Sequence, residues 1–196
     1  NSNRLQLQIQ SYKIRKYYRM KKICVFCGSS KPKQNSNLEN EVISLGKLLL
    51  RKKLHLVYGG AKIGLMGLIS ETILLEGGHV TGIIPKILSK KEIINKEVSE
   101  LIVVNNMHER KKKMYDLSDA FIILPGGIGT LEEFSEITTW KVLGIMKKPI
   151  FLLNYNGFYD NLIKQFKVMR DNNFLYSDIF KEVTIINSVS DLDNLM

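Results

Sequence analysis

Short apolar segments recur along the chain, separated by longer segments of mixed character. The apolar segments are residues 22–26, 54–58, 80–84, 101–104, 121–124, 150–153 and 183–186. Most of them are bounded by glycine, proline or polar residues. Such runs are typical of strands in a parallel sheet that is covered on both faces.

The segments between these runs predict helices. We expect helices at 37–53, 64–76, 107–118, 130–145 and 158–170. In the first of them, leucine and valine recur at helical spacing along one face, as in a helix that packs on a sheet. Strands that alternate with helices predict an α/β fold, which here is a single Rossmann-like domain with an open parallel sheet and helices on both faces.

The length of 196 residues suits one domain with a full α/β core. We place this domain at 22–196, because the first predicted strand begins there. Residues 1–21 are basic, lack acidic side chains and predict a disordered extension or the remnant of a targeting peptide. The extension carries part of the net charge of +10, so that charge does not by itself indicate a nucleic acid or membrane partner.

The two cysteines lie at the end of the first predicted strand. Side chains at positions i and i+3 of a strand face opposite sides, so Cys24 and Cys27 predict buried free thiols, with neither a disulfide nor a shared metal ion. No apolar run approaches the roughly 18 residues that a membrane span requires. We therefore expect a reducing, cytoplasmic location, or an organelle if the basic extension targets one.

The most informative stretch is 121–140, FIILPGGIGTLEEFSEITTW. It predicts a buried strand, a tight glycine turn and a helix start in immediate succession. Gly126, Gly127 and Gly129 allow close backbone approach, so several N–H groups can point at one anion where the helix begins. Thr130 is the expected N-cap residue of that helix.

Glu133 has two interpretations on this stretch alone. Thr130 and Glu133 match a capping box, in which both side chains satisfy the helix N-terminus. Alternatively, a carboxylate one turn into a helix that binds phosphate would lie beside the sugar of a nucleotide, where it can act as an acid or base.

The preceding helix, 107–118, carries four consecutive basic residues. Arg110 and Lys111 share the stripe of Met107 and Met114, so they are predicted to face inward, whereas the next two lysines face solvent. A guanidinium turned inward needs an anionic partner.

A second glycine-rich turn spans 59–64. Its spacing is close to the dinucleotide fingerprint, but Ala61 replaces the second glycine. The next strand is followed by Pro85, whereas the fingerprint requires an acidic residue there to bind the ribose. NAD binding is therefore not predicted.

Several of these segments, taken together and in order, resemble one family. They are MHERKKKM at 107–114, SDAFIILPGGIGTLEE at 118–133, FCGSS at 26–30, YGGAKIGLMG at 58–67 and TTWKVLGIMKKP at 138–149. From about residue 22 to about residue 171 the chain resembles the LONELY GUY family of cytokinin riboside 5′-monophosphate phosphoribohydrolases, which were long labelled lysine decarboxylases. A joint match at these spacings is specific, whereas one glycine turn alone is not.

The resemblance implies a homodimer that cleaves a nucleoside 5′-monophosphate, an N6-substituted adenosine nucleotide or AMP, into free base and ribose 5-phosphate without a metal or organic cofactor. It implies that Arg110 and Glu133 are catalytic. The implied substrate-binding residues are Gly28, Ser29, Gly59, Gly60, Glu92, Lys111, Gly126, Gly127, Ile128, Gly129, Thr130, Leu131, Glu132 and Thr139. Glu92, in a polar loop expected over the mouth of the site, corresponds to a glutamate that contacts the purine or its substituent. Ala61 stands where the family often has a third glycine, so we expect a slightly displaced turn and retained binding.

Three other functions fit the sequence less well. A molybdenum-cofactor carrier shares the fold and the glycine turn, but the presence of both Arg110 and Glu133 argues against a carrier. Lysine decarboxylation would need a lysine Schiff base with pyridoxal phosphate, for which 111–113 offers no evident pocket. Nucleic acid binding lacks any groove-reading or stacking motif.

Overall fold

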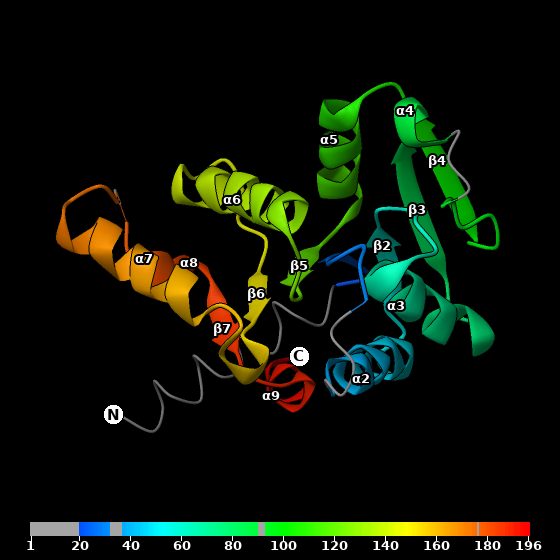
Figure 1. Cartoon of the computed structure of the whole chain (residues 1–196), viewed down its shortest axis with the longest axis horizontal. Coiled ribbons are helices and arrows are strands. Elements are labelled where there is room, and N and C mark those ends of the chain that lie inside the picture. The colour runs from blue at the N-terminus through cyan, green and yellow to red at the C-terminus, as the bar shows by residue number, and fades with distance from the viewer. Residues whose placement is uncertain (1–19, 32–36, 90–92, 176) are drawn as a thin grey trace.

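The computed structural model describes residues 20–31, 37–89, 93–175 and 177–196. Within them the chain forms a seven-stranded sheet in which every pair of neighbouring strands is parallel, with the order β4-β3-β2-β1-β5-β6-β7 (Figure 1). The strands are β1 (Lys22–Phe26), β2 (His55–Tyr58), β3 (Val80–Pro85), β4 (Glu100–Val104), β5 (Ala120–Ile123), β6 (Ile150–Leu153) and β7 (Thr184–Ile186). All seven predicted strands are therefore confirmed.

The five predicted helices are also present, with shifted ends. They are α2 (Leu38–Arg51), α3 (Gly64–Leu75), α5 (Met107–Leu117), α6 (Ile128–Val142) and α7 (Asp160–Asp171). Shorter helices that the pattern did not predict are α4 (Lys86–Ser89), η1 (Tyr155–Gly157), α8 (Ile179–Glu182) and α9 (Val189–Leu195). Their few residues give too little periodicity to detect.

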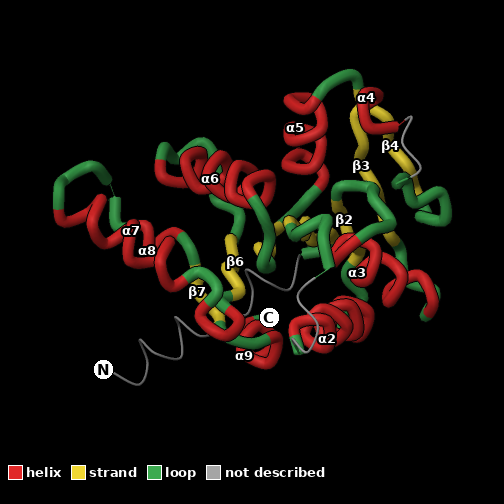
Figure 2. Tube along the Cα trace, in the orientation of Figure 1, coloured by secondary structure: helices red, strands yellow, loops and turns green. Residues whose placement is uncertain are grey.

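Helices cover both faces of the sheet (Figure 2). Helices α2, α3 and α9 pack on one face, and α5, α6, α7 and α8 pack on the other. Cys27 belongs to the first of these two apolar cores and Cys24 to the second, so the free thiols do face opposite sides. The Rossmann-like prediction is confirmed.

The strand order reverses between β1 and β5, because the chain winds outward in both directions from these two central strands. The loops after them touch: the Gly28 amide donates to the Pro125 carbonyl at 3.1 Å, and a Cβ on Gly28 would lie 3.4 Å from the Gly126 Cα. Ligands of open α/β sheets bind in the crevice at such a reversal, outside the carboxyl ends of the strands.

The packed domain begins slightly before the predicted boundary. Met20 packs against the core, and the Lys21 and Lys22 amides donate to the Asp119 carboxylate at 2.7 and 2.9 Å. Residues 1–19 lie outside the described part of the chain, so the extension stays a prediction. None of the helices in the described part is long and apolar enough to span a membrane.

Candidate active site

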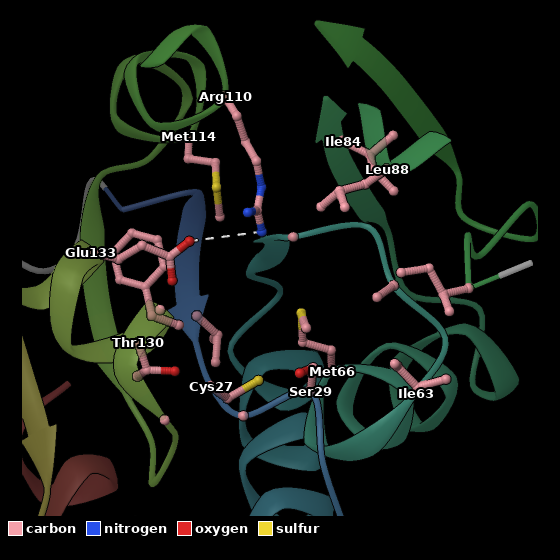
Figure 3. Close-up of a pocket in the computed structure, with 18 of the residues that line it drawn as sticks. Cys27, Ser29, Ile63, Met66, Ile84, Leu88, Arg110, Met114, Thr130 and Glu133 are labelled. Atoms are coloured by element: carbon pink, nitrogen blue, oxygen red, sulfur yellow. Dashed lines mark ion pairs between the residues drawn. The ribbon is translucent and has the colours of Figure 1, made fainter. Parts of the chain in front are cut away.

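A pocket of about 410 Å³ lies at the reversal point of the sheet (Figure 3). Its wall is built from the ends of β1, β2 and β3, the first turn of α6 and one face of α5. The volume lies within the roughly 300–1,000 Å³ of small-molecule sites.

Arg110 enters this pocket from α5. The helix begins after Asn106, whose side chain accepts a hydrogen bond from the Glu109 amide at 2.9 Å. The Arg110 Nε donates to the Ile83 carbonyl at 3.1 Å, which fixes the guanidinium against the end of β3. There is room for it because Gly59 has no side chain: a Cβ at that position would collide with the Arg110 Nη2. The predicted inward orientation of Arg110 is confirmed.

Glu133 faces Arg110 across the top of the pocket (Figure 3). Its Oε1 lies 3.7 Å from the Arg110 Nη2, and the residue is only 8% exposed. Burial raises the pKa of the Glu133 carboxyl to about 7, although the Arg110 charge opposes the shift. A carboxyl that titrates near neutrality inside a pocket is suited to acid–base or electrostatic work on a ligand.

The capping-box interpretation of Glu133 is wrong. Helix α6 begins at Ile128 and its N-cap residue is Gly127, so Thr130 and Glu133 both lie inside the helix. Thr130 packs instead against the glycine turn. Its Oγ1 lies so close to Gly126 that a Cβ at that position would collide with it. The first turn of α6 borders the pocket with backbone N–H groups that have no intrahelical acceptor, which is the usual way a helix N-terminus binds an anion.

Most of the predicted site residues are brought together here. Besides Arg110 and Glu133, the lining includes Gly28, Ser29, Gly59, Gly127, Ile128, Gly129 and Thr130. Gly60 and Gly126 adjoin the lining without being part of it. Gly60 adopts φ +78°, in the left-handed region that favours glycine.

The other predicted site residues in the described part of the chain lie outside the pocket lining. The Lys111 ammonium is turned toward α6, where it pairs with Glu132 and lies 3.2 Å from the Glu136 Oε1. Leu131 packs against the apolar core. The Thr139 hydroxyl donates to the Ser135 carbonyl at 2.8 Å, beside a separate cavity.

Glu92 lies outside the described residues, so its predicted contact is not located. The residues that follow it are described, and Ile93 lines the pocket. The predicted loop over the mouth of the site is therefore partly confirmed.

The pattern of polar residues did not reveal the apolar part of the pocket. The lining includes the apolar side chains of Ile63, Met66, Ile84, Leu88, Ile93 and Met114. Ile63 lies in the second glycine-rich turn, and Met66 lies two residues after that turn. Their nearness to a glycine-rich turn was the signal in the sequence that they could line the pocket. The pocket thus combines the N–H groups at the start of α6 with apolar side chains, Arg110 and Glu133.

A metal site is not evident. Among the described residues no group of three or more His, Cys, Asp and Glu side chains is placed to hold a metal ion. The polar groups of the pocket lining include the Glu133 carboxyl, the Arg110 guanidinium and the side chains of Ser29 and Thr130.

The sheet order and the glycine turn define a Rossmann-like α/β protein with a pocket at the strand reversal. Residues 66–196 match the family model described as "Possible lysine decarboxylase". The chain belongs to this family, which is the LONELY GUY family resembled by its motifs.

Named relatives agree with this assignment. Cytokinin riboside 5′-monophosphate phosphoribohydrolase LOG of Oryza sativa subsp. japonica is 46% identical over 160 residues, which are 82% of this chain and 66% of the rice protein. The Arabidopsis thaliana enzyme LOG7 is 47% identical over 157 residues, 80% of this chain and 72% of that protein. The chain therefore spans about two thirds of the length of the rice relative, at 66%, and 72% of the length of the Arabidopsis relative.

Solved structures agree on the fold alone. The molybdenum cofactor binding protein of Rippkaea orientalis has a TM-score of 0.65 and 24% identity, with 90% of this chain and 95% of that chain covered. The molybdenum cofactor carrier protein of Chlamydomonas reinhardtii has a TM-score of 0.62 and 19% identity, with the same shares covered.

Proposed function

We propose that this chain hydrolyses the N-glycosidic bond of cytokinin riboside 5′-monophosphates, with AMP as a further substrate. The observation that carries the proposal is the buried Arg110–Glu133 pair, which lies in the same pocket as the α6 glycine turn. The relatives named above are phosphoribohydrolases at 46% and 47% identity.

The reaction replaces the bond between C1′ and the purine nitrogen by a bond between C1′ and a water oxygen. The purine keeps the electron pair of the broken bond and gains a proton, and the other product is ribose 5-phosphate. Bond breaking passes through an oxocarbenium-like state, as in glycoside hydrolysis, so a carboxylate beside C1′ stabilises positive charge or activates water. Glu133 takes this role in its ionised form.

The remaining groups bind and orient the substrate. The main-chain amides from Gly127 to Thr130 hold the 5′-phosphate at the N-terminus of α6. Arg110 contacts the ribose and the phosphate, and its charge favours ionised Glu133. Gly28 and Ser29 line the side of the pocket that faces this turn. No step in this scheme requires a cofactor.

Three further assignments are also proposals. Glu92 contacts the purine or its substituent, and Thr139 contacts substrate only if the assembly brings it to a site. The assembly is a homodimer built on α5 and α6. Trp140 is half-buried on α6 and packs edge-on against Tyr115 of α5, with ring centroids 5.1 Å apart.

The test is to incubate the protein with isopentenyladenosine monophosphate, AMP and the corresponding ribosides, and to measure free base by chromatography. We expect base release from the monophosphates only, because the phosphate supplies the anion that the α6 turn binds. Cleavage of a riboside at the rate of its monophosphate would refute the phosphate-binding role of the turn. Absence of free base from every nucleotide would refute the proposed function.

The carrier and decarboxylase functions are less well supported. The likeness to cofactor carriers is below 25% identity and extends to the fold only. For decarboxylation, the described pocket lining contains no lysine, and Lys111 is engaged by Glu132 and Glu136. A Schiff base with pyridoxal phosphate therefore has no evident attachment point there.

A further inference from the structure

One wall of the pocket is a short segment held in place by the chain opposite it. We call residues 93–97 the mouth segment. The Lys62 amide donates to the Ile93 carbonyl at 2.8 Å, and the Asn95 amide donates to the Gly60 carbonyl at 2.9 Å. Ala61 and Ile94 form an antiparallel bridge between these bonds. Ile93 and Ala61 both line the pocket, so the pairing shapes the pocket directly.

Asn95 anchors this segment from below the surface. Its side chain is buried, at 7% exposure, whereas the next two residues are exposed. The Asn95 Nδ2 donates to the Ser70 Oγ at 3.2 Å, and its Oδ1 accepts from the Glu97 amide at 3.1 Å. Both ends of one side-chain amide are therefore used, one to bind α3 and one to turn the mouth segment.

The contact of Asn95 continues into the core. Ser70, a residue of α3, is fully buried and donates to the Gly67 carbonyl of the same helix at 3.0 Å. The buried Tyr58 hydroxyl makes no hydrogen bond within the described residues. Burial raises the pKa of the Tyr58 phenol, and the Ser70 and Asn95 side chains oppose this shift. The mouth segment is thus fastened to the end of β2 and to α3.

We propose that Asn95 is a positioning residue for substrate binding, which rests on the proposed function of the pocket. It touches no reacting atom and acts through the mouth segment, by keeping Ile93 and Ala61 in the wall of the pocket. If substrate binds only while the mouth segment is paired with residues 60–62, a lower population of the paired state raises the apparent dissociation constant in proportion. The effect should fall on KM, because Arg110 and Glu133 are held by other elements.

The test compares Asn95→Ala with the wild-type protein. We expect KM for the nucleoside monophosphate, and Kd for AMP measured by calorimetry, to rise about three- to tenfold, as expected for the loss of one buried hydrogen bond. We expect kcat to stay within about twofold. Amide hydrogen exchange at residues 62 and 95 should accelerate, while exchange in the central strands stays unchanged.

Asn154→Ala is the matched control. Asn154 is also buried, at 8% exposure, and uses both ends of its side chain: Nδ2 donates to the Asp160 Oδ1 at 2.8 Å and Oδ1 accepts from the Tyr159 amide at 2.7 Å. It lies after β6 and outside the pocket lining. We expect a lower Tm with unchanged KM, so a general loss of stability is separated from a change in the pocket.

Several outcomes would overturn the inference. Unchanged exchange at residue 62 would show that Asn95 does not hold the mouth segment, and unchanged KM and Kd with faster exchange would show that the segment does not shape binding. An equal rise in KM for Asn154→Ala would assign the effect to stability. If the wild-type protein binds AMP but releases no base, the proposed function fails, while the Kd comparison still decides the role of Asn95.

Discussion

The sharpest test of the active-site geometry is a small substitution that leaves both charged residues in place. Gly59 is buried at the end of β2, and its φ lies outside the left-handed region, so its backbone accepts alanine. The new Cβ would collide with the Arg110 Nη2 and lie 3.0 Å from the Met66 Sδ. Gly59→Ala therefore acts on the guanidinium without removing it.

The structure fixes the expected size of this effect. The guanidinium would have to retreat by about 1 Å before its contact with the new Cβ is of ordinary length. A misplacement of about 1 Å in a reacting group can cost roughly 10²-fold in rate, or about 3 kcal/mol of barrier. Both crowded atoms belong to flexible side chains, so the cost in folding free energy should stay near 1 kcal/mol, typical of mild overpacking.

The assay is kcat/KM for base release from the monophosphate, measured beside Tm. Gly46→Ala is the control, because its Cβ would lie 2.8 Å from the Thr72 Cγ2 where α2 packs on α3, remote from the pocket. We expect Gly46→Ala to lower Tm and keep kcat/KM. We expect Gly59→Ala to lower kcat/KM roughly 10²-fold with only a small fall in Tm. If Gly59→Ala keeps kcat/KM within about threefold of wild type, the position of Arg110 does not limit the reaction and the reasoning fails.

Three further predictions concern charge. The folded-state pKa of Glu133, about 7, lies above its usual 4.5, so the folded state binds more protons between these values and its stability falls as pH rises through that window. Glu133→Gln should therefore be more stable than wild type at pH 8, by up to about 3 kcal/mol, and equally stable near pH 4. Its kcat should fall roughly 10²- to 10⁴-fold. Equal Tm values of the two proteins at pH 8 would contradict the effect of burial. Wild-type kcat/KM should rise with pH through about 7 as the carboxyl ionises. Lys111→Gln should move this rise to higher pH, because Lys111 lowers the Glu133 pKa while its partners Glu132 and Glu136 raise it; an unchanged midpoint would refute this coupling.

Much of the fold could be predicted because its strands are buried on both faces. A continuous apolar run such as 121–124, closed by proline and glycine, is typical of a central strand in an α/β chain. Helix α9 was missed because Val189–Leu195 is too short for a clear helical period. Its start is nevertheless marked in the sequence, since Ser188 and Asp191 form a capping box with an aspartate in place of the usual glutamate.

The site was predictable where spacing alone decides orientation. The positions of Arg110 and Lys111 relative to Met114 placed both side chains inward, and both are buried. Spacing could not tell which anion each would meet, because that depends on how α5 packs against α6. The predicted start of α6 at Thr130 was wrong because residue type alone favours threonine as the N-cap. In the structure Gly127 takes the extended φ/ψ of −92° and −157°, and the helix begins directly after it.

Two charged contacts join α5 to α6, and they differ in what they contribute. Lys111 with Glu132 and Glu136 is an outer contact, in which two carboxylates share one ammonium near solvent. Arg110 with Glu133 is an inner contact whose two side chains are only 11% and 10% exposed, at a separation of 3.7 Å. At that length and burial the attraction does not fully offset desolvation, as the raised pKa of Glu133 indicates, and well-packed apolar side chains are often as stable at such positions or more so. The outer contact links the two helices near solvent, whereas the inner one contributes less to stability as the pH rises from 4.5 to about 7. This cost fits the proposed function, in which both charges meet the substrate.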